Sequence, residues 1–441
     1  MKKRLISTVL SVLVTVPLFV GCGNTQSTTE DIVTKLESPV SIEMWHYLTG
    51  AQGDALQGII DDFNKTNGQG ITVNAVNQGN ISDLNKKVIA AAQSNTLPAI
   101  INVYPDLATG LINEGKIIEL SPYINDSTIG IADDVKNDFI KSFIDEVSQW
   151  GTNKIYGLPL TKSTEVVYVN KTLLTELGYT TNDLNGLTME KLTEISKKCY
   201  DELGIPGFGF DSSSNAFIST LKMNGADFVE LDGTINVDND WVREFMDYYK
   251  NNVEAGYFRI PGEDTFLSGP FSNQKVMMYE GSSAGASHIN AENFELAVCE
   301  VPKFQNKNAA VIQQGASLFV TSNVTKEQQY AAYEFIKFAT NTDNTARFAV
   351  ETGYLPVRKS AEETSTMQEA LKDTNSVYAK VFPVANKSLD YSYYTPAINN
   401  AQSARATVQE KFDAYVTGGI KSIEDFINDT VTQVKTSIGR S

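Results

Sequence analysis

The residues from Gly281 to Gly285 read GSSAG, which fits the G-x-S-x-G pattern of hydrolase nucleophile elbows. That pattern would make Ser283 a nucleophile and would require a histidine base on a distant loop later in the chain. The sequence has two histidines: His46 precedes the serine, and His288 follows it by five residues. No triad can be assembled from them. We therefore interpret this segment as a glycine-serine turn that offers backbone and hydroxyl donors.

A second stretch resembles a phosphate-binding loop. Residues 110–116 read GLINEGK and match most of the pattern G-x-x-x-x-G-K-[ST], but Ile117 stands where a serine or threonine must bind magnesium. Leu107 and Leu111 have helical spacing instead, and Gly115 suits the C-terminal end of such a helix. We interpret the stretch as an amphipathic helix and not as a nucleotide site.

Other catalytic and metal-binding patterns are absent from the sequence. Two histidines and no clustered cysteines do not supply the ligands of a zinc site. The two catalytic carboxyl groups of a glycosidase are recognised by their distance in space. The order of acidic residues along this chain shows no pair that we can assign to that chemistry. We expect a binding protein without metal or cofactor, not an enzyme. A lipid-anchored glycan-processing enzyme and a surface adhesin remain as alternatives; the first would turn over oligosaccharides, and the second would not bind a small molecule saturably.

Length and charge limit the class further. A chain of 441 residues suits two or three domains, and 41% hydrophobic residues suffice for real cores. The formal net charge of −17 argues against nucleic acid or anionic lipid as a partner and favours solubility. We expect a monomer that binds no nucleic acid.

The N-terminal segment has the pattern of an export signal. Three cations at positions 2–4 precede an apolar run at 5–20, which is too short to span a membrane. The run ends in FVGC, which resembles a bacterial lipobox with Phe19 in place of the usual leucine. Cys22 would then be diacylated and become the mature N-terminus. A cleaved signal with an incidental cysteine is the alternative.

Cleavage after residue 21 would change the mature chain in two respects. It would remove three cations and no acids, so the formal net charge would go from −17 to −20. Residues 22–38 would then be a flexible tether between lipid and fold, since they are polar and without a pattern. Cys199 and Cys299 could form a disulfide in an extracytoplasmic protein, but their spacing does not demand one.

The folded chain is expected to begin at Pro39 with alternating strands and helices. Strands are predicted at 41–48, 71–76 and 99–103, with a helix in each gap, the second one capped by Ser82. This order predicts a parallel α/β sheet. Ligands of such sheets gather beyond the carboxyl ends of the strands, which here are Trp45–Gly50, Asn77–Ser82 and Tyr104–Asp106.

The segment 155–171, IYGLPLTKSTEVVYVNK, marks a change of domain. Pro159 fixes its own φ and lacks a backbone donor, so it belongs at the start of a strand. Five polar residues at 161–165 precede the apolar strand 166–169, and a central strand would not interrupt its apolar run in this way. We interpret 161–165 as a crossing that leaves one packed unit, faces water or a ligand, and enters a second unit.

The stretch GLPLTKSTEVVYVNKTLL resembles the first inter-lobe crossing of ABC-importer solute-binding proteins, in the sugar-binding and glycerol-phosphate-binding group of family 1. WHYLTG at 45–50, QQGASLFV at 313–320 and ETGYLPVRKS at 351–360 extend the resemblance over nearly the whole chain. It implies an α/β, two-lobe fold of the type II periplasmic-binding-protein class, with the ligand in the cleft between the lobes.

The resemblance implies that each lobe is discontinuous. Residues 39–162 and 304–354 would form lobe 1, and residues 163–303 and 355–441 would form lobe 2; residues 1–21 would be the lipoprotein signal peptide. Closure about the crossing segments would trap the ligand, as in other periplasmic binding proteins. The membrane permease would recognise the closed form.

Ligand contacts also follow from the resemblance. In the glycerol-phosphate-binding branch a serine of a glycine-serine turn, a glycine amide, a tyrosine and an arginine hold the phosphate; here they correspond to Ser282 or Ser283, Gly315, Tyr354 and Arg405, with Ser163 from the crossing. Arginine offers a planar fork to oxygen atoms, and glycine allows close backbone approach. A helix-surface charge at Arg405 and a packed turn at Tyr354 remain the alternatives.

The sequence departs from that branch where glycerol would be recognised. Ile81 stands in place of a tyrosine, Pro105 in place of a carboxylate with Asp106 beside it, and Asp211–Ser214 in place of paired tryptophans. The floor of the site would then be more polar, with Glu165 and Asp211 as candidates. Trp45, His46 and Tyr47 would supply aromatic surface, unless Trp45 is buried.

Together these patterns predict a lipid-anchored protein on the extracytoplasmic face of the cell membrane. It would capture a mono- or oligosaccharide and deliver it to an ABC permease. Glycerol phosphate or a glycerophosphodiester is the alternative ligand.

Overall fold

The computed structural model describes residues 32–439. The predicted signal peptide, Cys22 and the tether up to residue 31 lie outside the described residues. Ile32, Val33 and Leu36 already pack against the larger hydrophobic core, so the chain contacts the fold before the predicted start at Pro39. Among the described residues, no helix combines the length and hydrophobicity needed to cross a bilayer.

The first sheet has five strands in the order β2-β1-β3-β11-β4. Its strands are β1 (Val40–His46), β2 (Ile71–Asn77), β3 (Ile100–Val103), β4 (Gly157–Ser163) and β11 (Gln314–Val320). The first three run parallel, and β11 is antiparallel to both of its neighbours. The parallel part agrees with the order of strands and helices in the sequence, whereas β11 enters from a distant part of the chain.

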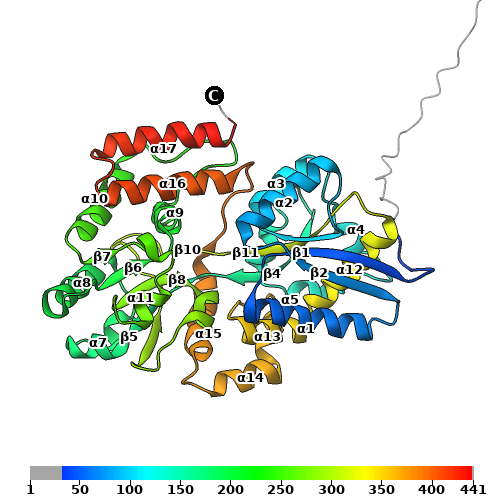
Figure 1. Ribbon diagram of the computed structural model, residues 1–441, viewed down its shortest axis with the longest axis horizontal. Coiled ribbons are helices and arrows are strands. Elements are labelled where there is room, and N and C mark those ends of the chain that lie inside the picture. Colours follow the sequence, from blue (N-terminus) through cyan, green and yellow to red (C-terminus); the bar gives the residue numbers. More distant parts are fainter. Residues whose placement is uncertain (1–31, 440–441) are drawn as a thin grey trace, which may run out of the picture. The chain divides into compact units, whose positions relative to one another are not determined.

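Helices cover both faces of this sheet (Figure 1). The apolar side chains of α1 (Gly50–Thr66) and α12 (Lys326–Ala339) belong to the larger hydrophobic core. Those of α2 (Ile81–Ser94) and α3 (Pro105–Asn113) form a separate cluster on the other face. Because both faces are buried, the central strand β3 reads as an uninterrupted run, IINV, with every residue buried.

The second sheet has five strands in the order β7-β6-β8-β5-β9. They are β5 (Glu165–Asn170), β6 (Phe208–Phe210), β7 (Phe258–Arg259), β8 (Met278–Ser282) and β9 (Leu296–Cys299). Alternate side chains of β5 enter different cores: Val167 and Val169 join the second core, while Val166 and Tyr168 join the first. This strand is therefore buried on both faces.

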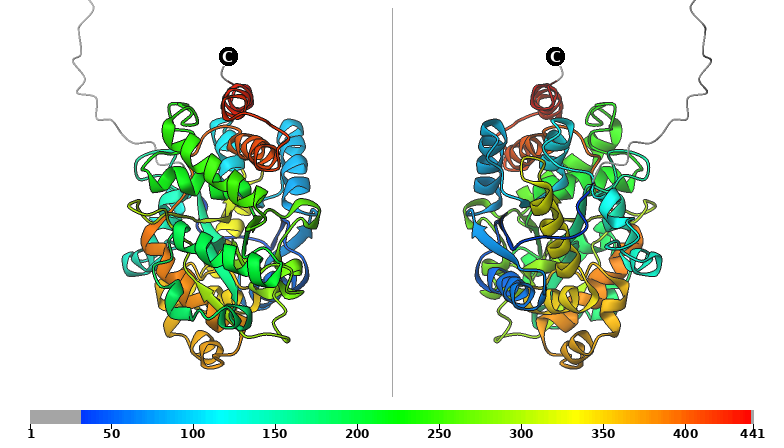
Figure 2. Two further views of the ribbon diagram at one scale, coloured as in Figure 1. Left: turned by 90° about the vertical axis from the view of Figure 1, so that its left-hand side faces the viewer. Right: turned by 90° about the vertical axis from the view of Figure 1, so that its right-hand side faces the viewer.

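Five long helices build the second core around this sheet. They are α8 (Met189–Leu203), α9 (Ser213–Met223), α10 (Asp240–Glu254), α16 (Ala401–Val416) and α17 (Ile423–Ser437). The last two lie side by side (Figures 1 and 2). The aromatic residues of α10 at helical spacing, Trp241, Phe245 and Tyr249, are core residues.

The remaining elements connect these two assemblies. Helices α13 (Thr342–Thr352), α14 (Ser365–Lys372) and α15 (Val377–Ser388) pack on the larger core, and the short strands β10 (Val311–Ile312) and β12 (Ser392–Tyr393) pair in parallel. Short helices are α4 (Ser121–Ile124), α5 (Asp133–Asp138), α6 (Lys141–Glu146), α7 (Lys171–Glu176) and α11 (Ser268–Ser272). Single 3₁₀ turns are η1 (Thr181–Leu184), η2 (Gly262–Asp264), η3 (Ser283–His288), η4 (Lys359–Glu363) and η5 (Leu389–Tyr391).

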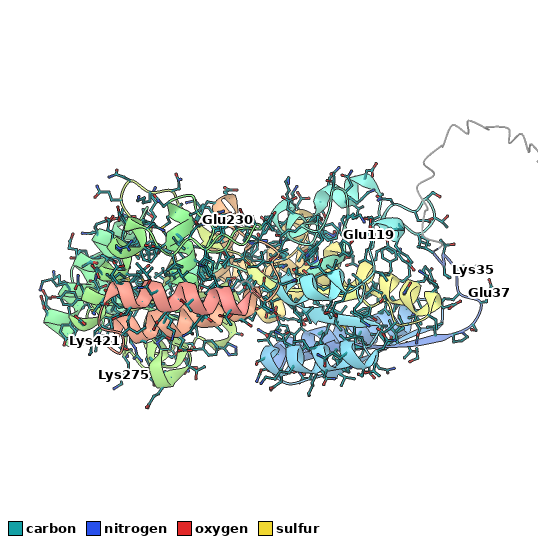
Figure 3. All side chains as sticks on the ribbon, turned by 90° about the horizontal axis from the view of Figure 1, so that it is seen from above. Lys35, Glu37, Glu119, Glu230, Lys275 and Lys421 are labelled. Carbon is teal, nitrogen blue, oxygen red and sulfur yellow. The ribbon has the colours of Figure 1, made fainter. Side chains whose placement is uncertain are left out.

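Many charged side chains stand on the outside of the fold. Lys35 and Glu37 form an exposed ion pair of 3.2 Å, and Lys275 and Lys421 are exposed (Figure 3). Cys199 and Cys299 are both free thiols, so the disulfide considered above does not form. Cys199 is buried in the second core, where it packs as a small apolar residue.

Two local predictions need correction. The N-cap of α2 is Asn80 and not Ser82, because the Asn80 side-chain oxygen accepts the backbone N–H of Asp83 at 3.0 Å. Pro159 lies inside β4 rather than at its start. The position tolerates proline because β4 is an edge strand and the register of its partner shifts between Ala316 and Ser317.

The polar crossing at 161–165 is buried and does not face water, one of the two surroundings that the sequence suggested; contact with a ligand stays a prediction. Lys162 is fully buried and forms an ion pair with Glu146 of α6, which is itself 6% exposed. The Lys162 ammonium also donates to the carbonyl of Gly315 at 3.2 Å. A charge buried this deeply requires such partners, because an unpaired charge in the interior is strongly destabilising.

We predict that Lys162→Met destabilises the protein by about 3–5 kcal/mol, because Glu146 would remain buried without its cation. Urea denaturation would measure the loss. The double variant Lys162→Met/Glu146→Leu should recover most of it. As a matched control, Lys141→Met removes an exposed ion pair with Asp145 on the same helix and should cost less than about 1 kcal/mol. A small loss in Lys162→Met alone would contradict the prediction.

Candidate functional site

The chain passes from the first sheet to the second at Thr164, between β4 and β5. The backbone N–H of Thr164 donates to the Ser283 hydroxyl at 3.3 Å, and its carbonyl accepts the Ser283 N–H at 2.8 Å. Its hydroxyl donates to the Ile312 carbonyl at 3.1 Å. Thr164 is thus bonded both to the turn after β8 and to the segment that leads back into β11.

Two carboxyl groups lie together just beyond this crossing. On the antiparallel pair β5–β8, Glu165 is opposite Ser282 and Val167 is opposite Glu280. Because side chains alternate along a strand, Glu165 and Glu280 share one face of the sheet. Both are buried, and they interact with each other. Two buried acids so close together favour a shared proton.

Burial is the main cause of the raised pKa values of the carboxyl groups at this site. It raises the pKa of Glu165 to about 7, while the hydrogen bond from Asn215 and the charge of Arg405 act in the opposite direction. Burial and the neighbouring Glu165 raise the pKa of Glu280 well above its ordinary value. Burial also raises the pKa of Asp211 to about 6, although Asp211 accepts the backbone N–H of Leu267 at 2.6 Å.

Asn215, on the first turns of α9, is the centre of the polar contacts. Its side-chain amide donates to Glu165 at 2.6 Å and to Gln314 at 2.9 Å, and its amide oxygen accepts a hydrogen bond from the Arg405 guanidinium. Gln314 belongs to β11 of the first sheet, whereas Arg405 belongs to α16. One asparagine therefore joins residues of three distant segments.

The ends of the first-sheet strands bring further polar groups close to Arg405. Asp106, at the start of α3, interacts with Arg405, Thr395 and Lys162; burial raises its pKa, and Arg405 opposes that rise. The Arg405 side chain also borders a cavity of about 20 Å³, which has room for roughly one water molecule.

A group of tyrosines lies at the same strand ends. The Tyr47 hydroxyl is 3.2 Å from the Thr161 hydroxyl, and the rings of Tyr47 and Tyr104 are 6.4 Å apart. Tyr354 interacts with the Tyr47 hydroxyl and stacks on Phe348. Burial raises the pKa of all three tyrosines, so they remain neutral donors and acceptors.

Several predicted site residues are therefore neighbours in the fold. Glu165 and Arg405 meet at Asn215, Asp211 lies beside the carboxyl pair, and Asp106 faces Arg405. Arg405 is 9% exposed and is not a helix-surface charge. Tyr354 both packs in its turn and reaches the tyrosine group, so the two interpretations of this residue are compatible.

Other predicted residues have structural roles at the crossing. Ser282 caps η3 by accepting the Ala284 N–H at 3.2 Å, and Ser283 is bonded to Thr164 as described. Ser163 is paired with Gln314. Gly315 has φ of +125°, and a Cβ there would collide with the Thr161 carbonyl oxygen, so only glycine fits.

The two aromatic candidates of β1 point to opposite faces of the strand. Trp45 packs on the cluster beneath α2 and α3, and its indole N–H donates to Glu43 of the same strand. His46 is buried, its Nδ1 has no protein partner among the described residues, and burial lowers its pKa. Trp45 is half-buried, which lies between the exposed aromatic surface and the buried side chain that the sequence analysis considered.

Sequence reasoning missed Asn215, Glu280 and Gln314, whereas Tyr104 lies in one of the strand ends that it named. Glu280 carried a usable signal, because an acid at the end of the apolar run VMMY is out of place in a buried strand. Asn215 follows three serines in a polar run and gave no such signal.

Comparison with known proteins identifies the family. A family model described as bacterial extracellular solute-binding protein matches residues 58–374, more than half of the chain. The chain belongs to this family. Its function is thus that of an extracytoplasmic solute-binding protein of an ABC importer, a transport receptor and not an enzyme, and its family implies an ABC permease as partner.

Relatives of this solute-binding protein include an sn-glycerol-3-phosphate-binding periplasmic protein, UgpB, from Brucella abortus. It is 21% identical over 407 residues, which cover 89% of this chain and 92% of the relative. A homologous UgpB from Pectobacterium atrosepticum is 23% identical over 402 residues, with 87% and 88% covered.

Solved structures confirm the two-lobe α/β fold. The structure of UgpB from Mycobacterium tuberculosis, in complex with glycerophosphocholine, has a TM-score of 0.77 at 18% identity and covers 91% of this chain and 99% of that one. The cyclic alpha-maltosyl-1,6-maltose binding protein from Arthrobacter globiformis has a TM-score of 0.74 at 20% identity, with the same coverage. At these identities the likeness concerns the fold alone.

We predict that the stability of the protein falls as pH rises from about 4.5 to about 7. In this range the folded state, with the pKa of Glu165 raised to about 7, binds more protons than the unfolded state. The effect of this one group is at most about 3 kcal/mol. Glu165→Gln, which carries no charge, should show a flatter dependence in urea denaturation at about pH 5 and about pH 8.

The matched control for this experiment is Glu244→Gln, at an exposed position of α10. It should keep the pH dependence of the native protein. An unchanged slope in Glu165→Gln would show that the carboxyl pair does not hold the extra proton.

Proposed function

We propose that the protein captures a neutral carbohydrate at the polar site around Asn215 and delivers it to the permease of its importer. The observation that carries this proposal is the number of carboxyl groups at the site: Glu165 and Asp106 interact with the guanidinium of Arg405, and Glu280 and Asp211 interact with Glu165. The other cation in contact with this group, Lys162, is already paired with Glu146. Carboxyl and amide groups can both accept hydrogen bonds from sugar hydroxyls and donate hydrogen bonds to them, and this does not require a charge on the ligand.

Glycerol phosphate or a glycerophosphodiester is the second candidate, because Arg405 is buried at the site and relatives are named for glycerol 3-phosphate. A phosphate group needs several donors and a net positive environment. Arg405 already donates to Asn215 and interacts with the Asp106 carboxyl, so part of its hydrogen-bonding capacity is used within the protein. These contacts favour the neutral ligand.

Capture by closure of two lobes fits the placement of these residues. Asn215 and Arg405 lie on helices packed against the second sheet, whereas Gln314 and Asp106 lie at strand ends of the first. We assign residues 39–162 and 304–354 to lobe 1 and residues 163–303 and 355–441 to lobe 2. A ligand that touches both sets would stabilise the closed state by its differential affinity for that state.

We predict that Arg405→Ala weakens sugar binding by about ten-fold to one hundred-fold, because hydrogen bonds from a charged donor contribute about 1.5–3 kcal/mol. Affinity of the native protein for the sugar should barely change between low and high salt, since no ionic attraction is screened. Titration calorimetry at two ionic strengths, with a panel of neutral sugars and with glycerol 3-phosphate, measures both effects.

Two controls sharpen this experiment. Arg405→Lys keeps the charge but not the planar fork. Arg243→Ala removes a half-buried arginine of α10 that pairs with Glu424, away from the site. The second should bind like the native protein. Salt-sensitive binding of glycerol 3-phosphate alone would overturn the choice of a neutral ligand.

We also infer that the protein is a lipoprotein anchored through Cys22, on the strength of the export signal and the lipobox-like FVGC at 19–22. An acidic chain has no electrostatic attraction to anionic lipid. Two acyl chains would supply the anchoring that the protein surface does not.

We predict that Cys22→Ala releases the protein from membranes into the soluble fraction, because the lipid would be its anchor. Membrane fractionation followed by a high-salt wash, with the native protein in parallel, measures the change. Cys199→Ala, at a thiol buried in the second core, serves as the control and should stay with the membrane. Retention of Cys22→Ala after the wash would contradict the anchor.

A further inference from the structure

We propose that the groove between α2, α3 and the start of α16 is an extension subsite that binds the further sugar units of an oligosaccharide. The inference rests on the proposed function and specifies its ligand. The groove has a volume of about 680 Å³. This lies within the roughly 300–1,000 Å³ of pockets that hold small-molecule ligands.

Uncharged polar side chains are the commonest class among the residues that line this groove, and apolar side chains lie between them. Those that carry the argument are Asn85, Gln93, Asn113, Asn399, Asn400 and Gln402. Each amide has both donors and an acceptor, which is the combination that sugar hydroxyls require. Ile89, which is 46% exposed, and Leu107 add apolar surface against which the C–H faces of a sugar ring can pack.

One amide of the groove has an unused acceptor. The side-chain oxygen of Asn85 is buried and has no hydrogen-bond partner among the described residues. Buried polar atoms are hydrogen-bonded in the great majority of cases, so an exception requires an explanation. Since this oxygen is itself covered, a sugar hydroxyl would supply the missing donor once the Asn85 side chain turns toward the groove.

The groove is continuous with the candidate site. Asp106 borders it and also faces Arg405 and Thr395. Across the groove, Asn113 of α3 donates to Asn399 at 3.2 Å, just before α16, the helix that carries Arg405. An elongated ligand held at Arg405 would therefore leave the site past Asp106 and enter the groove.

Charge makes a sugar a better occupant than a peptide segment of the permease. The groove holds one cation, Lys86, and the two acids Asp106 and Glu114. Specific protein contacts commonly rely on aromatic and arginine anchors, which this groove lacks among its lining residues. Its amides match hydroxyl groups instead.

The test compares Gly110→Phe with a matched control. Gly110 lies in α3 at the groove, and Gly269 lies in α11 away from it; a Cβ at either position meets nothing within 4 Å, and neither has a positive φ. The aromatic ring introduced by Gly110→Phe would fill the groove, whereas Gly269→Phe places the same ring elsewhere. Thermal melts confirm that both variants fold.

Calorimetry would use matched series of gluco- and galacto-oligosaccharides, from monosaccharide to tetrasaccharide. We expect the native protein and Gly269→Phe to bind the tetrasaccharide of the recognised series at least about ten-fold more tightly than its monosaccharide. Gly110→Phe should lose this gain. The double variant Gln93→Ala/Asn113→Ala, at two exposed positions, should reduce the gain by about two- to ten-fold, because each lost hydrogen bond is modest.

Each other outcome has a definite meaning. Equal affinity for every chain length, or a length gain that persists in Gly110→Phe, overturns the extension subsite and leaves the proposed function intact. Native oligosaccharide binding with lost stimulation of the permease in Gly110→Phe would assign the groove to the transporter and also overturn it. Failure of every sugar, with salt-sensitive binding of glycerol 3-phosphate, would overturn the proposed function itself.

Discussion

Burial of charged and polar groups where the chain passes between its two sheets is the constraint on which the rest of the structure depends. Lys162 and Glu165 lie on either side of Thr164, and both are buried. Each therefore needs a protein partner, and the partners come from other elements of the chain: Glu146 for Lys162, and Asn215 for Glu165. The crossing is fixed by these bonds and not by apolar packing alone.

The same bonds place the site. Because Asn215 must satisfy Glu165, the first turn of α9 is held against β5, and the amide is left to contact Gln314 and Arg405 as well. Glu165 and Glu280 meet here. Burial disfavours the charged form of both carboxyl groups, so the arrangement is more stable when the two share a proton. Retaining such a group in a fold is costly, so its position at the meeting point of the lobes suits a role in recognition better than one in stability.

Some glycine and serine residues that correspond to ligand contacts in the family have a structural role in the backbone of this chain. Gly315 is required by its close approach to Thr161, and Ser283 is bonded to Thr164 on both its backbone and its hydroxyl. A residue that is locked in this way can still present one group to a ligand. Its presence in a motif, however, does not by itself distinguish the two roles.

The sequence by itself determined the alternation of strands and helices at 40–103, the crossing at 157–170 and the family to which the chain belongs, because these depend on local periodicity and contiguous motifs. It also indicated Arg405, Glu165 and Asp211. Only the tertiary structure decided that Asn215 links them, that Glu280 pairs with Glu165, and that the crossing is buried. These contacts join residues up to about two hundred positions apart, and no local pattern of side chains encodes such a meeting.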